Sequence, residues 1–92
     1  MADVVVTMRI MPESPEIDLA LMQTKIMSLI DSFAGKGARK TETEPVAFGL
    51  KALVIMFVMA ESNGSTEGLE KQIETVKGVN SVEVTDVRRT IG

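Results

Sequence analysis

Apolar residues recur along the chain with two different periods, and these periods predict where strands and helices lie. A repeat of two is typical of strands, whereas steps of three and four are typical of amphipathic helices. One apolar face alternates near the start of the chain and consists of Val4, Val6, Met8 and Ile10. Residues 4–11, rich in β-branched side chains, therefore predict a first strand, which Pro12 and Pro15 end.

A helix is predicted next, because the apolar positions change to helical spacing after Ile17. These positions are Leu19, Met22, Ile26, Leu29, Ile30 and Phe33. Ser14 or Asp18 supplies an N-cap for this helix, and the sequence leaves the choice between them open. Gly35 and Gly37 are expected to end it.

The middle of the chain predicts two further strands joined by a turn. Residues 36–45 are polar and charged, so we expect a loop that runs into an edge strand through Val46. Phe48 and Gly49 form the expected tight turn. The apolar run over residues 50–60 is the strongest strand in the sequence.

A second, shorter helix and a last strand complete the pattern. The turn residues 63–65 break the preceding strand, Thr66 begins the helix, and Gly78 closes it. The apolar positions of this helix are Leu69, Ile73 and Val76. Residues 79–87 then alternate again and predict the last strand.

The order strand, helix, strand, strand, helix, strand predicts the fold class. It indicates an α+β protein of the ferredoxin-like, split βαβ type, with a four-stranded antiparallel sheet and both helices on one face. The chain has 92 residues, so residues 1–92 are expected to form a single domain. Both faces of the strand over residues 50–60 are apolar, which favours either a modest exposed patch or a contact surface for a partner or a second copy.

Composition and charge exclude several classes of function. The chain has no cysteine and no histidine, which removes the thiol nucleophile, the usual general base and the commonest metal ligand. Ten Lys and Arg against thirteen Asp and Glu give a net charge of −3, whereas nucleic-acid binders are basic. Residues 50–60 are too few to span a membrane, and residues 1–3 lack the basic start of a signal peptide. We expect a cytoplasmic protein without membrane or direct nucleic-acid contact.

No motif for covalent chemistry emerges from the chain. Residues 35–41 faintly suggest a phosphate-binding loop, but Arg39 stands where a glycine is required, and the segment leads from a helix into a strand. The carboxylates are scattered, and no pair lies in the apolar surroundings that acid–base catalysis uses. We expect no catalytic residue, no metal site and no cofactor, so the protein is not an enzyme.

Two local features are candidates for partner contacts. Phe48 lies at the tip of the predicted turn, either as a core plug or as a contact anchor. Arg88 and Arg89 follow the last predicted strand. They form either a frayed charged tail or cations presented to an acidic or phosphate-bearing site of a partner.

Three segments resemble the archaeal elongation factor 1-beta family, a stand-alone version of the guanine nucleotide exchange domain of eukaryotic elongation factor 1-beta. They are residues 11–15 (Met-Pro-Glu-Ser-Pro), residues 44–53 (Glu-Pro-Val-Ala-Phe-Gly-Leu-Lys-Ala-Leu) and residues 79–89 (Val-Asn-Ser-Val-Glu-Val-Thr-Asp-Val-Arg-Arg). The resemblance covers essentially the whole chain and implies a ferredoxin-like fold. It also implies a protein that releases GDP from elongation factor 1-alpha so that GTP can reload it.

The resemblance further implies which residues act. A near-terminal lysine, which in eukaryotic relatives reaches the magnesium and phosphate site of the GTPase, falls at Arg89, and the phenylalanine of the family's Phe-Gly turn falls on Phe48. Arg88 is expected as a reserve or steering charge, and Lys51 as a contact at the rim. The second cation and the extension over residues 90–92 leave open which arginine inserts. The partner is expected in its GDP-bound and nucleotide-free states, and this protein alone as a monomer.

Two other functions compete with this interpretation. A regulatory domain of the same fold that binds a small ligand would use the doubly apolar third strand and form a stable homodimer, which size-exclusion chromatography detects. An RNA-binding domain needs exposed aromatic residues on the central strands. The third strand offers only Phe57, on the face assigned to the core.

Overall fold

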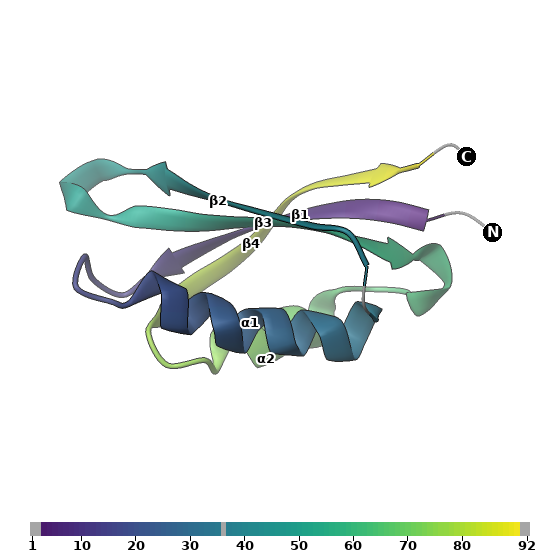
Figure 1. Ribbon diagram of the computed structural model, residues 1–92, viewed down its shortest axis with the longest axis horizontal. Coiled ribbons are helices and arrows are strands. Elements are labelled where there is room, and N and C mark those ends of the chain that lie inside the picture. Colours follow the sequence, from purple (N-terminus) through teal and green to yellow (C-terminus); the bar gives the residue numbers. More distant parts are fainter. Residues whose placement is uncertain (1–2, 36, 91–92) are drawn as a thin grey trace.

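The computed structural model describes residues 3–35 and 37–90, and its elements follow the predicted order (Figure 1). The helices and strands are β1 (Asp3–Pro12), α1 (Leu19–Ala34), β2 (Arg39–Pro45), β3 (Lys51–Ala60), α2 (Glu67–Glu74) and β4 (Val79–Arg89). Two single 3-10 turns, η1 (Ala47–Gly49) and η2 (Glu61–Asn63), flank β3. The expectations for residues 1–2, for Lys36 and for the last two residues of the tail lie outside the described residues.

The four strands form one antiparallel sheet in the order β2-β3-β1-β4, and both helices lie on the same side of it (Figure 1). The core fills the space between them with the apolar faces of β1, α1, β3 and α2. This arrangement confirms the ferredoxin-like α+β fold. Phe57 is buried in this core, as expected, and neither described helix has the length and apolar character needed to cross a bilayer.

The start of α1 is fixed by Asp18 and not by Ser14. The carboxylate of Asp18 accepts a hydrogen bond from the backbone N–H of Leu21 at 3.2 Å, which satisfies one of the unpaired donors of the first turn. The Ser14 hydroxyl instead accepts from the backbone N–H of Glu16 in the preceding turn. At the other end, Gly35 adopts a φ of 76° and ends the helix as predicted. The second helix is shorter than predicted, since α2 ends at Glu74, before Val76 and Gly78.

The prediction that residues 36–45 form a loop is wrong for most of that segment. Arg39–Pro45 is strand β2, which pairs along its whole length with β3, and Val46 lies beyond its end. The segment is polar because β2 is an edge strand and neither face of it is covered: every residue after Arg39 is exposed. Its ladder of hydrogen bonds with β3, rather than burial, defines the strand.

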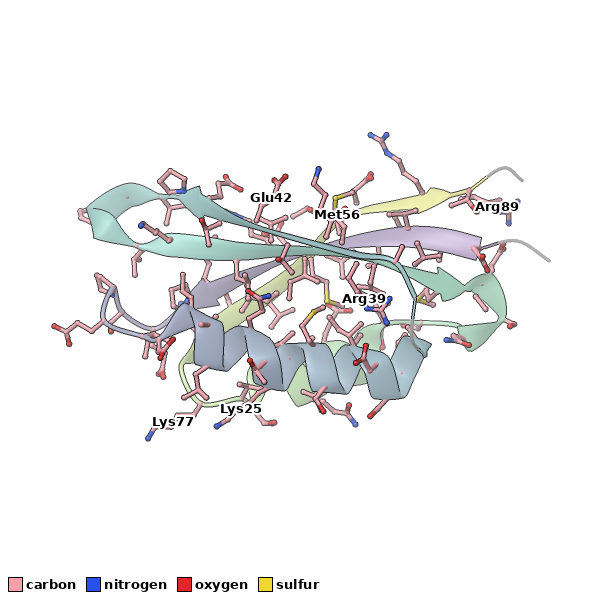
Figure 2. The ribbon with its side chains drawn as sticks, viewed as in Figure 1. Lys25, Arg39, Glu42, Met56, Lys77 and Arg89 are labelled. Atoms are coloured by element: carbon pink, nitrogen blue, oxygen red, sulfur yellow. The ribbon has the colours of Figure 1, made fainter. Side chains whose placement is uncertain are left out.

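Arg39 joins the end of α1 to β2. Its guanidinium donates hydrogen bonds to Asp31 Oδ1 at 3.2 Å and to the carbonyl of Gly35, and it lies 5.9 Å from the ring centroid of Phe57. Figure 2 shows this side chain between the sheet and α1, where it is only 11% exposed. Arg39, which the sequence predicted to lie in a polar loop, therefore has a structural role.

The helix-free face of the sheet is apolar only in its centre. The apolar side chains there come from the central strands and are half-buried: Val5, Val54, Met56 and Val58. Charged residues of the edge strands flank them: Lys40, Glu42, Asp86 and Arg88. Figure 2 shows Glu42 and Met56 projecting from this face. The apolar part of this face is therefore confined to the central strands.

Candidate functional site

The four residues predicted to contact a partner lie at opposite ends of the sheet. Phe48 and Lys51 lie where β2 turns into β3, and we call this the turn end. Arg88 and Arg89 close β4, beside the start of β1, and we call this the arginine end. Eight residue steps along β3 separate Lys51 from Met59, which lies next to the arginine end, so the two ends are about 26 Å apart. The protein is elongated, with a longest extent of 42 Å.

At the turn end, Phe48 is presented to solvent and does not plug the core. It is 93% exposed and occupies the left-handed backbone region, with φ of 64° and ψ of 27°. Two hydrogen bonds hold the turn, from Val46 N–H to the Leu50 carbonyl at 2.8 Å and from Leu50 N–H to the Ala47 carbonyl at 3.3 Å. A left-handed conformation is unfavourable for a bulky residue, and the ring gains no burial in return.

A groove of about 440 Å³, which the sequence did not predict, lies beside this turn. Lys51 and Gly49 line one part of it, and the loop between β1 and α1 lines the rest: Pro12, Ser14, Pro15, Ile17 and Leu19. The only signal in the sequence was the pair Pro12 and Pro15, which predicted the end of the first strand. The turn end thus offers an exposed aromatic ring, one exposed cation and a shallow groove.

At the arginine end, a β-bulge decides which way each arginine faces. Thr7 pairs with Asp86 but Met8 pairs with Val84, so Thr85 is an extra residue in β4. Beyond this bulge, Arg88 pairs with Val5 of the helix-free face. Because neighbouring residues of a strand point to opposite faces, Arg89 lies on the helix side.

The two arginines also differ in their partners. Arg88 is 80% exposed, and its Nε lies 2.8 Å from Asp86 Oδ2 on the same strand. Arg89 is 68% exposed and forms an ion pair with Glu61 of η2. Figure 2 shows Arg89 at the end of β4. Both arginines belong to β4, which ends two residues later than the predicted strand, so neither is part of a frayed tail. The Thr90 N–H donates to the Asp3 carbonyl at 2.8 Å and ties the end of β4 to the start of β1.

Arg89 borders a hollow of about 490 Å³ with an apolar floor. The floor consists of Val4, Val6, Met59 and Val87, and the rim of Glu61, Gly64, Ser65, Thr66 and Arg89. Val4 and Met59 are almost fully buried. The arginine end therefore combines a charged rim with an apolar base.

Chemical groups for catalysis or metal binding do not gather at either end. Within residues 3–35 and 37–90, no three Asp or Glu side chains are arranged to hold a metal ion, and no polar or charged residue is buried. Such an arrangement suits binding through exposed charges and a projecting ring. It provides no dry pocket of the kind that acid–base chemistry uses.

Comparison with known proteins assigns the chain to a family. A family model described as the EF-1 guanine nucleotide exchange domain matches residues 5–90. Elongation factor 1-beta of Methanothermobacter thermautotrophicus is 44% identical over 89 residues, covering 97% of this chain and 98% of that protein. The proteins of the same name from Methanobrevibacter smithii and Methanosarcina barkeri are 42% and 40% identical, each over 97% of this chain and 98% and 99% of their own.

A solved structure supports the fold alone. The de novo designed protein Foldit4 superposes with a TM-score of 0.63 at 19% identity, covering 98% of each chain. Its likeness shows how general this arrangement of strands and helices is, whereas the sequence matches are specific. On those sequence matches, the chain belongs to the family of EF-1 guanine nucleotide exchange domains.

Proposed function

We propose that this protein promotes the exchange of GDP for GTP on elongation factor 1-alpha, and that Arg89 and Phe48 make the decisive contacts. The observation that carries the proposal is the family match over residues 5–90, which spans nearly all of the described chain. A role in guanine nucleotide exchange during translation elongation follows from that match. Relatives of similar length bear the name elongation factor 1-beta, which does not favour a ligand-binding homodimer.

Exchange of this kind requires binding and no covalent step. An exchange factor acts by binding the nucleotide-free GTPase more tightly than the GDP-bound form, since equal affinity for both shifts no equilibrium. The protein therefore acts without a cofactor and is not an enzyme in the usual sense. It acts as a monomer on the GTPase.

Arg89 is the residue that disturbs the magnesium and phosphate site of the GTPase. The magnesium ion is the largest local charge in such a site and holds the β-phosphate of GDP. A guanidinium is always protonated and forms bidentate contacts with carboxylates and phosphates, so it competes for the same oxygens. The position of Arg89 at the end of β4, with its head group exposed, supports this role. Arg88, on the other face of the sheet, steers the approach.

Phe48 is an apolar anchor at the opposite end. Its exposed ring and left-handed backbone lower the stability of the free protein. Burial of the ring in a pocket of the partner stabilises the complex and accounts for this conformation. Lys51 contributes a contact at the rim of the same surface. Since the two ends are about 26 Å apart, the GTPase contacts the factor at two separate places.

The test is the release of a fluorescent GDP analogue from elongation factor 1-alpha, with and without this protein. Removing a charge-assisted contact costs about 1.5–3 kcal/mol, so Arg89→Ala is expected to slow the accelerated release by about 10- to 100-fold. Arg88→Ala, a matched loss of one cation, is expected to change it by about two-fold at most. Phe48→Ala is expected to raise the half-saturating concentration by about ten-fold.

Matched controls separate these effects from unfolding. Leu21→Ala removes another exposed apolar side chain, on α1, and is expected to leave release unchanged. No acceleration by the native protein at micromolar concentration would refute the exchange function for this partner. Acceleration that survives Arg89→Ala, with the fold intact by circular dichroism, would move the displacing role to Arg88 or to the anchor surface.

A further inference from the structure

Glu61 is the residue that holds Arg89 in the free protein. It follows directly on β3 as the first residue of η2, and its carboxylate is ion-paired with the Arg89 guanidinium. In the sheet, Arg89 pairs with Val4 and Val4 pairs with Met59 of β3. The arginine side chain therefore reaches across the beginning of β1, from one neighbouring strand to the segment that follows the other.

We propose that Glu61 is a positioning residue for nucleotide exchange: it is the internal counter-ion of Arg89, and a negatively charged group of the GTPase replaces it on binding. This inference rests on the proposed function, because Arg89 must leave one anion to reach another. The partner group is a carboxylate or a phosphate, since both accept the planar fork of a guanidinium.

The backbone of β4 keeps its position during this replacement. Arg89 pairs with Val4, and the next residue, Thr90, donates two hydrogen bonds to the Asp3 carbonyl, from its N–H at 2.8 Å and from its hydroxyl at 3.1 Å. These contacts fix the start of the arginine side chain. Only the flexible part beyond Cβ is free to change partner.

The surroundings of Arg89 suit a head group that moves while its stem stays packed. The apolar floor of the hollow, with Val4 and Met59, lies along the path from β4 to Glu61. A long basic side chain keeps its methylene groups on such a floor while its charged end remains in water. Arg88 differs, because its counter-ion Asp86 lies two residues away on the same strand. Its ion pair therefore does not connect β4 to another element.

The direction and size of the effect follow from this geometry. An ion pair that exists only in the free protein opposes binding, so removing the Glu61 charge strengthens binding to the GTPase. Exposed ion pairs are weak, and the half-saturating concentration of Glu61→Gln is therefore expected to fall by about two- to five-fold. The maximal release rate is expected to stay the same, because Arg89 reaches the same site in the complex.

The experiment is a titration of GDP release with the full chain, one control variant described below and four test variants: Glu61→Gln, Glu61→Asp, Arg89→Gln and the double variant Glu61→Gln/Arg89→Gln. Glu61→Asp keeps the charge and is expected to behave like the native protein. Glu61→Gln is expected to have no effect once Arg89 is Gln. Glu74→Gln makes the same change of net charge at the last residue of α2 and is expected to leave the titration unchanged.

The possible outcomes distinguish a failure of this inference from a failure of the proposed function. An equal titration for Glu61→Gln and the native protein, while the native protein accelerates release, overturns this inference and leaves the proposed function standing. An effect of Glu61→Gln that persists with Arg89→Gln overturns it too, since the charge then acts on the GTPase directly. No acceleration by the native protein refutes the proposed function and this inference together. Unchanged melting temperatures of the variants exclude a loss of fold as the cause.

Discussion

Replacing Arg39 by alanine tests whether a residue of the polar segment before β3 stabilises the fold. The side chain donates to Asp31 and to the Gly35 carbonyl, both at the end of α1, and it packs against the edge of the core at Phe57. Asp31 is itself largely exposed and stays hydrated when its partner is removed. The variant therefore loses contacts without leaving a buried charge.

The magnitude follows from these three contacts. The ion pair with Asp31, whose carboxylate is exposed, contributes at most about 1 kcal/mol. The hydrogen bond to the Gly35 carbonyl contributes about 1 kcal/mol, and the guanidinium over the Phe57 ring about 0.5 kcal/mol. Arg39→Ala is thus expected to lower the free energy of unfolding by about 2 kcal/mol. For a domain of this size, that corresponds to a fall of about 10 °C in melting temperature.

The assay is urea and thermal unfolding followed by far-ultraviolet circular dichroism, because the chain has no tryptophan or tyrosine to report by fluorescence. Lys40→Ala, which removes the adjacent exposed cation and its pair with Glu42, is the matched control. It is expected to change the free energy of unfolding by less than about 0.5 kcal/mol. If Arg39→Ala destabilises no more than this control, the structural role of Arg39 is wrong.

Two further predictions concern backbone conformation. Phe48→Asn is expected to raise the free energy of unfolding by about 0.5–1 kcal/mol, because asparagine tolerates the left-handed region, while it weakens nucleotide exchange; a loss of stability would contradict the argument. Gly78→Ala is expected to lower the free energy of unfolding by about 2 kcal/mol, since φ is 96° and the new Cβ would lie 2.9 Å from Ile17 Cγ2. Its control in urea unfolding is Gly68→Ala on α2, where an added Cβ meets nothing within 4 Å. This control is expected to raise the free energy of unfolding by about 0.5–1 kcal/mol, because alanine favours a helix over glycine.

β1, α1 and β3 were predictable from the sequence, as was an edge strand before β3. The position of that edge strand was not, because a loop was expected over most of the residues that form β2. β1, α1 and β3 carry apolar residues at regular spacing because each packs against the core, so periodicity located them. β2 is exposed on both faces, and hydrogen bonds to β3 hold it in place. Every residue has a backbone carbonyl that accepts such bonds and every residue except proline has an N–H that donates them, so they leave little trace in the pattern of side chains.

The candidate site was predictable as a set of residues but not as an arrangement. The residues themselves marked Phe48 and Arg89 as candidates and the resemblance to a family supplied their roles, while the separation of the two ends required the topology of the sheet. The faces of Arg88 and Arg89 depend on the single extra residue at Thr85. Side chains of a strand alternate between the two faces of the sheet, and one extra residue switches the face of every residue that follows it. A prediction that ignores the bulge therefore places each arginine on the wrong face.

The pairing of β4 with β1 has a consequence for how the protein is made. β1 is synthesised before the other described elements and β4 after them, yet these strands are neighbours in the sheet, with Val4 opposite Arg89. Contacts so distant in sequence form slowly and only once both partners are available. During synthesis, one edge of β1 stays open until β4 emerges, and an unpaired edge of this kind favours aggregation. The sheet is therefore completed only after the residues of β4 have left the ribosome and paired with β1.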